Sequence, residues 1–526
     1  MSTAIVWFRK SLRLDDNPAL SHACSENSIT SILPLFIVDP DIVGSNFEKY
    51  HANRIRFLLE SLEDLDANLK AKLGAKLSVL FGKPTEILDQ LFQDSGSDIS
   101  LLSSDYCSEP HGRSLSTEIV KKIKLQFPSS DVVFHPSVQT VLDIEKVTQD
   151  PSFKEPKSMK DIEKIFLGTF GLDDSGLLAL PKPLPPPQKI PPPSAPLELL
   201  CSTLSSSNGI SSPKSLREHL SQDQRLPKSS LNSYFKGGES EALNRLRTKV
   251  EGQSDFVNSF KKPKTFSTNQ FDNPLEPSTT GLSPYLSTGN LSVRRLWLEI
   301  QSCNRSSSHS QPPESLSGQL LFREMFYLLS RSVQNWEDDS NNKMCKKIAW
   351  GERDQKLVSA WEEGHTGFPL IDAMMRQLES TGWMHHLGRH AVSCFFTRGQ
   401  LWQHWKLGRD IFERKLLDSD WALNNGNWLW LSGVAPFSMP YFRLYNPCPD
   451  AKSSLNVETT QAAFIKHWIP ELANMPAKYV YEPHLAPLSI QEEADCIIGK
   501  HYPAPIVERK ESAKSNLAKF KQSLAA

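Results

Sequence analysis

The chain has 526 residues, which is too long for one hydrophobic core and predicts two or three domains. Hydrophobic residues make up 39% of it and charged residues 23%, as in soluble globular proteins. The 59 Lys and Arg residues balance 60 Asp and Glu residues to a net charge of −1, which excludes a bulk attraction to nucleic acid and leaves a local basic patch as the source of any DNA contact.

The cysteines, the hydropathy and the N-terminal pattern bear on the compartment. Eight cysteines lie scattered without a CxxC pair, which is typical of buried thiols in a reducing compartment rather than of disulfides or a zinc site. No segment approaches the roughly 20 apolar residues of a membrane span. A strand pattern begins at Ala4 and leaves no room for a signal peptide. We therefore expect a soluble intracellular protein with no membrane partner.

Residues 1–140 alternate apolar runs with helical patterns such as Asn53–Lys72 and Thr85–Phe92. This alternation predicts βαβ units and an α/β domain with a doubly wound, Rossmann-like parallel sheet, which binds ligands at the carboxyl ends of its strands. Neither GxGxxG nor a GxxxxGKS/T loop is present, so the sequence predicts no phosphate-binding loop there. The expected strands are Ala4–Phe8, Ile32–Val38, Leu77–Phe81, Ile99–Leu102 and Val132–Phe134.

Residues 141–237 are expected to connect two domains. Nine prolines fall within 181–196, which excludes a helix or a central strand and predicts a semi-rigid polyproline linker. The Ser-rich stretch Ser202–Ser233 is expected to continue this connection.

From Gly238 onward the pattern is almost entirely helical. We predict an all-α domain over 238–500, followed by a short Lys- and Ser-rich tail over 501–526. Most of the twelve tryptophans fall after residue 297, so this half of the chain needs large aromatic surfaces. The expected helices are Glu239–Val250, Leu291–Gln301, Ser317–Ser330, Gln355–Glu363, Pro369–Thr381, Met384–Thr397 and Gln400–Phe412.

Three histidines and an arginine stand together at His385, His386, Arg389 and His390. His386 and His390 are four residues apart and would share one face of the predicted helix. Two titratable imidazoles on one face suit proton transfer near a bound organic group. Two other interpretations stay open: the histidines bind a metal, although no HExxH arrangement supplies a general base, or they are core residues with satisfied hydrogen bonds.

Several long motifs carry a resemblance that runs from residue 4 to about residue 445. They are WFRKSLRLDDNPAL (7–20), TTGLSPYL (279–286), GQLLFREMF (318–326), WEEGHTGFPLIDAMMRQL (361–378), GWMHH (382–386) and LLDSDWALNNGNW (416–428). In these motifs the chain resembles the photolyase/cryptochrome family of flavoproteins. The resemblance implies FAD in a folded shape inside the helical domain.

The resemblance also implies which residues hold the outer part of FAD. Thr279, Thr280 and Ser283 would hydrogen-bond the phosphates, and Gln319 and Arg323 would line the cavity. The three hydroxyl residues precede a helical stretch and could simply cap it, but exposed N–H groups at a helix start also suit phosphate, so both roles can hold together.

Around the isoalloxazine, the resemblance implies a charge-assisted pair between Arg389 and Asp418, with His386 nearby. Asp420 would accept a hydrogen bond from the flavin ring edge, and Asn424 would face N5. An amide at that position is neutral and can donate or accept, which tolerates both the radical and the reduced flavin. Asp418 and Asp420 could alternatively be an ordinary pair of helix-capping residues.

Four tryptophans match the electron-transfer chain of the family. Trp428, Trp405 and Trp350 match its triad, with Trp428 nearest the flavin, and Trp402 matches the distal fourth member of animal-type branches. Trp402 and Trp405 are three residues apart and are expected on one helix face. An indole can lose an electron transiently without breaking a covalent bond, so such a series can reduce photoexcited FAD; in an arbitrary helical protein these residues would be core filler.

His386 and His390 separate branches of the family. Cyclobutane-dimer photolyases typically carry Asn and Met at these positions, whereas two histidines mark (6-4) photolyases and some animal-like cryptochromes. Repair of a (6-4) photoproduct moves an OH or NH group between bases, so it needs a proton donor as well as an electron. We expect His386 to be that donor, held cationic by its partner, with His390 tuning its charge.

The leading hypothesis is a light-driven DNA (6-4) photolyase that acts on UV-damaged DNA. The lesion must leave the base stack and enter a pocket beside the flavin. Gln319 would hydrogen-bond a flipped base, and Trp421 or the run Trp428–Trp430 would form the wall. The candidate phosphate contacts are Lys343, Lys346, Lys347, Arg398 and Arg443.

The alternative is a cryptochrome photoreceptor or circadian regulator with clock or signalling partners, and one chain could serve both functions. The histidine pair and the short tail after His501 favour repair, and the same histidines disfavour cyclobutane-dimer repair. Repair of nuclear DNA would place the protein in the nucleus, otherwise in the cytoplasm, although no dense basic import signal is present. We expect a monomer.

The chain departs from the family pattern at several positions. Phe322 stands where (6-4) photolyases usually carry Trp, Gly388 replaces a usual Ala, and the common FGKKxDPxGxYIR segment after Tyr445 is missing, which puts some DNA contacts in doubt. Tyr106 and Glu109 fall in a loop where relatives bind an antenna pigment, and these residues do not distinguish a deazaflavin from a folate or from no pigment.

Overall fold

The computed structural model describes residues 2–94, 99–193, 195–205, 208–226, 234–262, 265–269, 273, 275–305, 308–450 and 452–525. Its N-terminal body is built on a five-stranded, all-parallel sheet in the order β3-β2-β1-β4-β5, the doubly wound arrangement that the sequence predicts. The strands are β1 (Ser2–Phe8), β2 (Ile29–Val38), β3 (Ser78–Phe81), β4 (Ile99–Asp105) and β5 (Asp131–His135).

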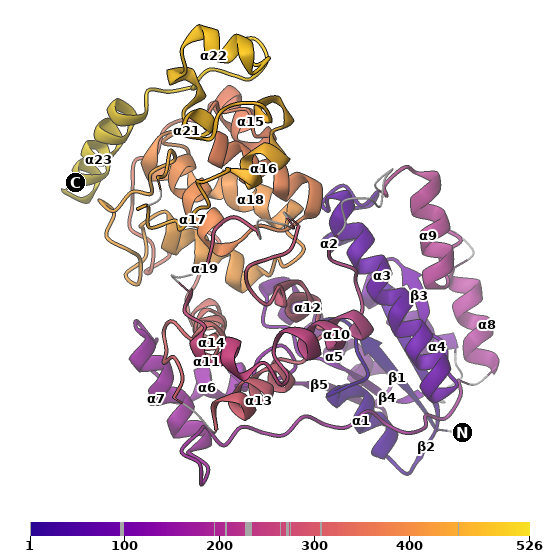
Figure 1. The fold of residues 1–526 in the computed structure, drawn as a ribbon. Coiled ribbons are helices and arrows are strands. Elements are labelled where there is room, and N and C mark those ends of the chain that lie inside the picture. The colour runs from indigo at the N-terminus through magenta and orange to yellow at the C-terminus, as the bar shows by residue number, and fades with distance from the viewer. Residues whose placement is uncertain are drawn as a thin grey trace.

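Alternating side chains of β1 explain how helices cover both faces of the sheet. Ala4, Val6 and Phe8 join one apolar core with α1 and α3, and Ile5 and Trp7 join a second core with α4 and α5. Figure 1 shows this layered body at one end of the molecule. Its helices are α1 (Pro18–Ser25), α2 (Pro40–Val43), α3 (Ala52–Asn68), α4 (Pro84–Asp94) and α5 (Pro110–Gln126).

Part of the region expected as a linker forms helices that pack on the two bodies. α6 (Ile144–Gln149) and α7 (Met159–Phe170) lie against α14 (Leu316–Ser332) in the core of the helical body. α8 (Ala195–Leu204) and α9 (Pro213–Gln222) instead cover β3 beside α4 and α3. The proline-rich run between them is neither helix nor strand over 181–193, as its composition predicts.

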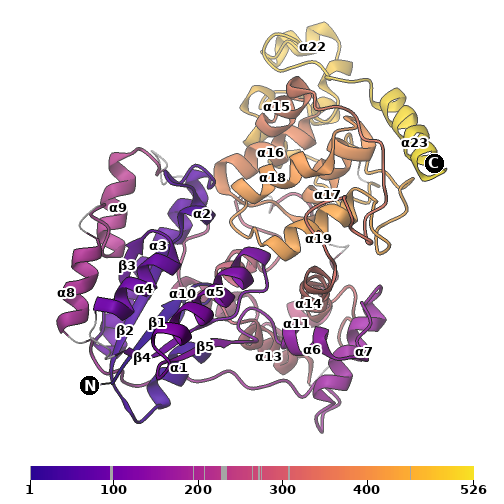
Figure 2. The same ribbon diagram turned by 180° about the vertical axis from the view of Figure 1, so that it is seen from behind.

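The C-terminal body is helical, and its core is one continuous apolar cluster. Figure 2 shows it beside the sheet body, with the last helices farthest from the sheet. Besides α14, its helices are α10 (Glu239–Lys249), α11 (Ser254–Ser259), α12 (Ser283–Thr288), α13 (Val293–Asn304), α15 (Gln355–Glu363), α16 (Pro369–Thr381), α17 (His386–Cys394), α18 (Trp405–Lys415), α19 (Trp421–Leu431), α20 (Ala463–Trp468), α21 (Ala477–Val480), α22 (Leu488–Glu493) and α23 (Arg509–Ala525).

The prediction of a helix over Gln400–Phe412 is wrong in its first turn. α17 runs into a wide turn over Phe395–Gly399, where Thr397 leaves helical geometry (φ −97°, ψ −106°). Trp402 then has a left-handed φ of 54°, and α18 begins at Trp405, capped by the His404 side chain, which accepts from the backbone N–H of Lys406. Trp402 and Trp405 therefore do not share a helix face.

The tail expected over 501–526 contains α23, which is docked on the helical body. Phe520 is fully buried, and Asn516 donates from Nδ2 to the Gly399 carbonyl at 2.9 Å. This helix lies at the edge of the body in both ribbon views. The last segment is therefore part of the domain it follows.

Buried charges join the two bodies. Arg294 of α13 reaches Asp16, which is fully buried in the sheet body, with Nε–Oδ2 and Nη2–Oδ1 distances of 2.9 and 2.7 Å. The neighbouring Arg295 holds Asp15 in the same bidentate way, at 3.0 and 2.6 Å. Paired planar groups of this kind fix orientation as well as distance, so they set how the bodies meet.

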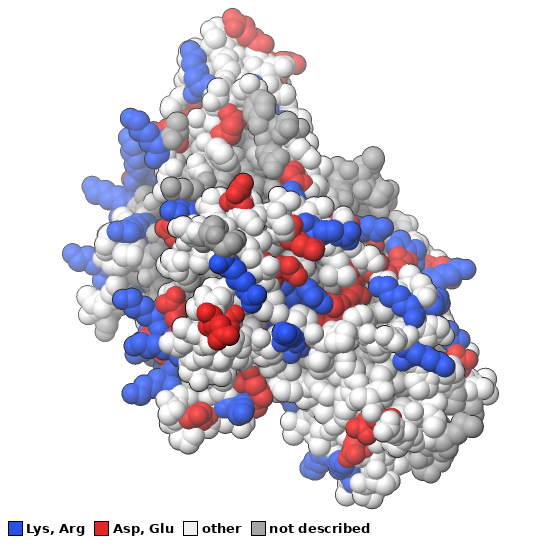
Figure 3. Space-filling model, turned by 60° about the horizontal axis from the view of Figure 1, so that its bottom comes forward, with Lys and Arg blue, Asp and Glu red and all other residues white. Residues whose placement is uncertain are grey.

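Two surface properties follow from the composition. No helix of the described part of the chain is both long and apolar enough to cross a membrane. On the face drawn in Figure 3, basic and acidic side chains alternate over the middle and right, whereas mostly basic side chains lie along the left edge.

Candidate functional site

Two adjoining cavities lie inside the helical body. The central cavity, of about 290 Å³, is walled by α12, α14, α17 and α19, and the side cavity, of about 240 Å³, lies behind α12. Residues common to both are Lys262, Thr279, Ser283, Leu286, Gln319, Arg323 and His386. Because so many walls are shared, one elongated ligand can occupy both.

Arg389 and Asp418 form the ion pair that the sequence predicts, on the wall of the central cavity. Nη1 and Nη2 of Arg389 lie 3.0 and 2.8 Å from the two carboxylate oxygens of Asp418, and Nε donates to the Met384 carbonyl at 2.9 Å. With all these groups paired, the guanidinium plane is fixed and presents a rigid polar edge to a ligand.

Asn424 and Asp420 have different surroundings. Asn424 lines the central cavity, and its Nδ2 donates to the Arg409 carbonyl at 3.0 Å, which leaves the amide oxygen for a ligand. Asp420 is not among the described residues that line either cavity. Its carboxylate caps α19 by accepting from the backbone N–H of Leu423 at 3.0 Å and accepts from the Tyr327 hydroxyl at 2.6 Å. The capping interpretation of Asp420 therefore holds.

The residues expected around the phosphates line the side cavity. Thr279, Thr280 and Ser283 stand at the start of α12, and Gln319 and Arg323 face them from α14. Arg323 is buried, and its Nη1 donates to the Gln139 carbonyl while Nη2 lies 3.4 Å from the Tyr327 hydroxyl. Hydroxyls and a buried guanidinium around one cavity suit an anionic group.

The donor set fits FAD. An anion-binding end with hydroxyls and Arg323 leads into a larger cavity with a fixed ion pair, an amide oxygen and apolar walls from Phe322, Leu423 and Trp428. A flavin ring needs a flat apolar slot with a few polar groups at its edge, and the phosphates need donors. The residues present therefore match both ends of the cofactor.

The histidines lie together at the start of α17, as their spacing predicts. The rings of His386 and His390 are 5.9 Å apart, and those of His385 and His386 are 4.2 Å apart. His386 and His390 line the central cavity, and His385 caps α17 by accepting from the backbone N–H of Leu387. Within the described residues, no group of three His, Cys, Asp or Glu side chains is arranged to hold a metal ion.

The expectation that one histidine is cationic is opposed by the surroundings. Burial, followed by the charges of neighbours such as Lys262, lowers the pKa of both His386 and His390 well below the usual histidine value. Both imidazoles are therefore neutral at neutral pH. Nε2 of His386 is buried and has no hydrogen-bond partner among the described residues, so it is free to bond a ligand.

Lys262 and Tyr445 are site residues that the sequence did not reveal. Lys262 lines both cavities, and its Nζ lies 5.8 Å from the centre of the Trp430 ring. Burial and the charge of Arg389 lower the pKa of Lys262 to about 8, so it still carries a proton at neutral pH. The Tyr445 hydroxyl lies 2.8 Å from Nδ1 of His390.

Sequence reasoning missed these two for a physical reason. Lys262 stands in a Lys-rich stretch, which is normally a solvated surface, and Tyr445 is remote in sequence from the histidines. The base-stacking wall also differs in part from expectation. Trp430 stacks on Phe322 (6.1 Å, 16°) and lies 5.1 Å from His390 on the cavity wall, whereas Trp421 is not among the described lining residues.

The four tryptophans divide into an inner and an outer part. Trp428 lines the central cavity and packs on α18, which begins at the buried Trp405. The His404 ring lies between two of these tryptophans, 5.9 Å from the Trp405 ring and 6.3 Å from the Trp350 ring. Trp350 and Trp402 are in contact at 4.9 Å. Trp405, His404, Trp350 and Trp402 thus follow one another through these ring contacts, despite the altered helix start.

Some candidate phosphate contacts have other partners. Arg398 is buried and donates to the carbonyls of Leu431, Tyr441 and Arg443, so it is structural. Lys343 is paired with Glu155, in the segment between α6 and α7, at 2.5 Å. The remaining candidates are exposed: Lys346, Lys347 and Arg443.

A third cavity lies at the carboxyl ends of β1 and β2, where the sheet topology predicts a ligand. This sheet cavity, of about 140 Å³, is closed on its other side by Ser287 and Ser419 of the helical body, which also line the central cavity. Glu109 lines it and is paired with Lys10 at 2.5 Å. Tyr106 is not among its described lining residues and instead donates to Glu145.

The chain matches family descriptions at both ends. Residues 4–187 match DNA photolyase, and residues 315–522 match the FAD binding domain of DNA photolyase.

Individual proteins are similar along nearly the whole chain. The (6-4)DNA photolyase of Arabidopsis thaliana is 39% identical over 100% of this chain and 89% of that protein. Cryptochrome-1 of Erithacus rubecula is 36% identical over 99% of this chain and 78% of that protein. The crystal structure of an archaeal photolyase from Sulfolobus tokodaii with two FAD molecules superposes with a TM-score of 0.73 at 22% identity, covering 99% of this chain and all of that one.

Proposed function

The chain belongs to the DNA photolyase and cryptochrome family, and on that premise we propose that it is a light-driven (6-4) photolyase of UV-damaged DNA. The observation that carries the proposal is the joint wall of the central cavity. His386, His390 and Lys262 line it together with Arg389 and Asp418, so proton-transfer groups and the flavin-edge pair face the same space.

The residues that line the central and side cavities have different roles in this proposal. When bound in its reduced form, FAD would supply the light-driven electron chemistry of repair. Thr279, Ser283 and Arg323 would hold its anionic end, and Arg389 with Asp418 would orient the ring. A flipped lesion base enters between Trp430 and Gln319, where apolar contact excludes water.

Proton transfer uses the groups around His386. Lys262 is protonated at neutral pH and lines the same cavities as His386, so Lys262 supplies the proton to the lesion, while the neutral His386, whose Nε2 has no partner among the described residues, hydrogen-bonds the lesion and holds it in place. His390 stays fixed by its contact with the Tyr445 hydroxyl and positions the neighbouring imidazole.

The test is product analysis after blue-light irradiation of the reduced, FAD-bound protein. One oligonucleotide carries a (6-4) photoproduct and another a cyclobutane dimer. We expect light-dependent restoration of the (6-4) lesion alone, and a loss of about 100-fold or more in His386→Ala, the usual size of the effect when a positioning contact is lost. His365→Ala is the matched control, because the His365 side chain is half exposed and lies outside the cavities. Restoration of the cyclobutane dimer would contradict the assignment.

A cryptochrome photoreceptor is the second candidate, and the docking of α23 favours it. Phe520 of this helix contacts both Trp350 and Trp402. Oxidation of either tryptophan can therefore alter the packing of α23, a segment that partners could bind. If neither lesion is restored while light still reduces the flavin, this candidate replaces repair. Either function on nuclear targets would place the protein in the nucleus.

We also propose that the sheet cavity holds a planar antenna pigment. It is lined by Trp7 and Tyr50 with the Lys10–Glu109 pair at its polar side, a setting for a flat ring with one ionisable edge. The Sulfolobus protein was crystallised with two FAD molecules, so a flavin is the first pigment to test. Fluorescence excitation spectra of the purified protein should show a second absorber, which Trp7→Ala should remove.

A further inference from the structure

The charges around the outer tryptophans differ from ring to ring. The guanidinium of Arg409 lies over Trp405 at 5.6 Å, and the ammonium of Lys519 lies over Trp402 at 5.6 Å. A cation above a neutral indole is mildly attractive. Once the ring has lost an electron, the same cation repels it, so both contacts disfavour an oxidised Trp405 and an oxidised Trp402.

Trp350, between these two, has the opposite surroundings. Its ring lies 6.3 Å from His404, whose Nε2 is 3.2 Å from Asp339. Asp338 and Asp339 both pair with the ammonium of Lys406, at 2.8 and 3.1 Å, so two carboxylates and, among the described residues, no cation directly over the ring lie on the His404 side of Trp350. Burial lowers the pKa of His404, which keeps this imidazole neutral and adds no positive charge beside Trp350.

We propose that Trp350, not Trp402, is where the positive charge rests after light-driven electron transfer, and that Lys519 of α23 keeps it there. The inference rests on the proposed flavin reduction through the tryptophan chain. One electron leaves Trp350 and passes inward through Trp405 and Trp428 to the flavin, so Trp350 is oxidised by one electron and the flavin is reduced by one. The indole N–H groups of Trp405 and Trp428 are buried without an acceptor among the described residues, so no proton leaves on the way.

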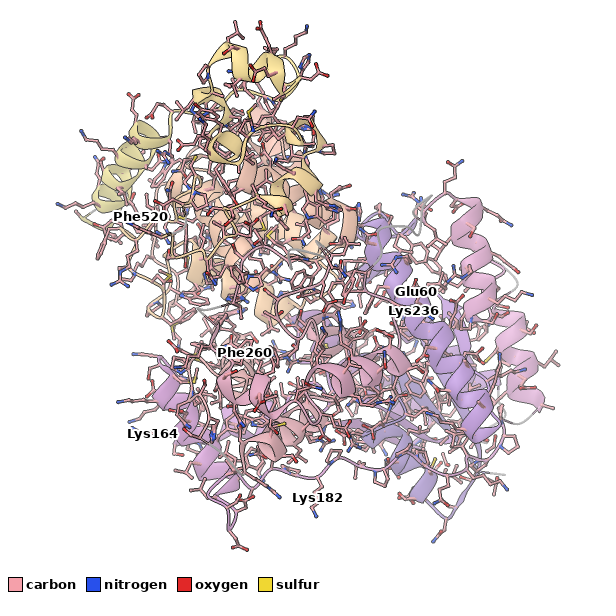
Figure 4. All side chains as sticks on the ribbon, in the orientation of Figure 1. Glu60, Lys164, Lys182, Lys236, Phe260 and Phe520 are labelled. Carbon is pink, nitrogen blue, oxygen red and sulfur yellow. The ribbon has the colours of Figure 1, made fainter. Side chains whose placement is uncertain are left out.

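The position of Lys519 is fixed by the residue that follows it. Phe520 is fully buried and contacts Trp350, Trp402 and the Tyr441 ring, on which it stacks at 4.8 Å and 4°. Figure 4 shows the labelled Phe520 on α23, at the side of the helix that meets the helical body. Lys519 is exposed, so its charge can be reversed without altering this packing.

The experiment is flash photolysis of the FAD-loaded full chain, with the lifetime of the tryptophan radical as the readout. Trp402→Phe should leave this lifetime within about twofold of the unsubstituted protein, whereas Trp350→Phe should shorten it about tenfold or more. In a Lys519→Glu background the charge should move to Trp402, so adding Trp402→Phe should then shorten the lifetime about tenfold, which corresponds to about 1.4 kcal/mol. Lys521→Glu, two residues further along α23, is the matched control and should not confer this sensitivity.

The outcomes separate the inference from its premise. If Trp402→Phe alone shortens the lifetime as much as Trp350→Phe, Trp402 is the resting place and the inference is wrong. If Lys519→Glu confers no sensitivity to Trp402→Phe, Lys519 has no part in it. If the unsubstituted protein with bound FAD forms no tryptophan radical at all, these tryptophans do not transfer electrons to the flavin. The proposed photoreduction is then wrong, and the inference is wrong with it.

Discussion

Lys262 is a cation placed where its charge is unfavourable without a ligand. It lies beside Arg389 in a cavity wall, and burial together with that guanidinium lowers its pKa to about 8. In the unfolded chain a lysine keeps its proton up to about pH 10.4. Between these values the unfolded state binds more protons than the folded state, so this residue makes the free energy of unfolding rise with pH.

Replacing Lys262 by Met should therefore stabilise the ligand-free protein at pH 7. We expect a gain of about 1–2 kcal/mol, less than the full shift implies because the residue keeps partial exposure. The gain should shrink as the pH rises from 8 to 10. Urea unfolding of both proteins at several pH values measures it, with Lys261→Met as the control; a pH-independent gain would show that packing rather than charge is responsible.

Gly388 is explained by its neighbour Met374. A Cβ added at this glycine would lie 2.6 Å from Sδ of Met374 and 3.1 Å from Cγ of Met384. Gly→Ala usually stabilises a helix by up to about 1 kcal/mol, but overpacking a core costs about 1–3 kcal/mol. We expect Gly388→Ala to lose about 1–2 kcal/mol in thermal unfolding, and to lose less in a Met374→Ala background. Equal losses in both backgrounds would rule out the steric explanation.

At the scale of elements, α23 shows a helix held by few contacts. Of its 17 residues, only Asn516 and Phe520 are buried. We predict that Phe520→Ala undocks the helix without unfolding the domain, because the other contacts of that domain do not depend on it. Hydrogen exchange should rise over 509–525 while the main unfolding midpoint shifts little. Leu524→Ala, at a side chain 43% exposed, is the control and should leave exchange unchanged.

The elements divide into those that the sequence predicts and those that it does not. Strong local patterns predict the parallel sheet and helices such as α15 and α16, whose bounds agree with the structure. α9 and α23 were not predicted, because a Ser-rich or Lys-rich stretch lacks a strong apolar pattern, and α8 was not predicted because it directly follows the proline-rich run; these helices depend on tertiary contacts. The late start of α18 depends on the left-handed backbone of Trp402, which periodicity cannot reveal.

The residues of the site also divide into those that were predicted from the sequence and those that were not. The family resemblance implied the Arg389–Asp418 pair and the common cavity of His386 and Asn424. Lys262 reaches that cavity from a distant loop, Tyr445 contacts His390 from another, and the protonation state of the histidines depends on burial, which spacing does not report.

At the scale of the whole molecule, Asp16 and Arg294 couple the two bodies. Asp16 is fully buried and Arg294 nearly so, and removing one partner leaves the other charge buried and unpaired. We expect Asp16→Asn to cost about 3–5 kcal/mol and to split thermal unfolding into two transitions. The control is Asp15→Asn, since the Asp15–Arg295 pair is more exposed and should cost about 1 kcal/mol or less. A single unchanged calorimetric transition in Asp16→Asn would contradict this coupling.

Ser287 and Ser419 separate the sheet cavity from the central cavity, and the Ser287 hydroxyl donates to the Ser419 carbonyl at 2.8 Å. Excitation energy passes between pigments with an efficiency that falls steeply with their separation. If the sheet cavity holds the proposed pigment, only this partition separates that pigment from the central cavity, so a change of pigment would alter the colour of light collected without altering the residues of the central cavity.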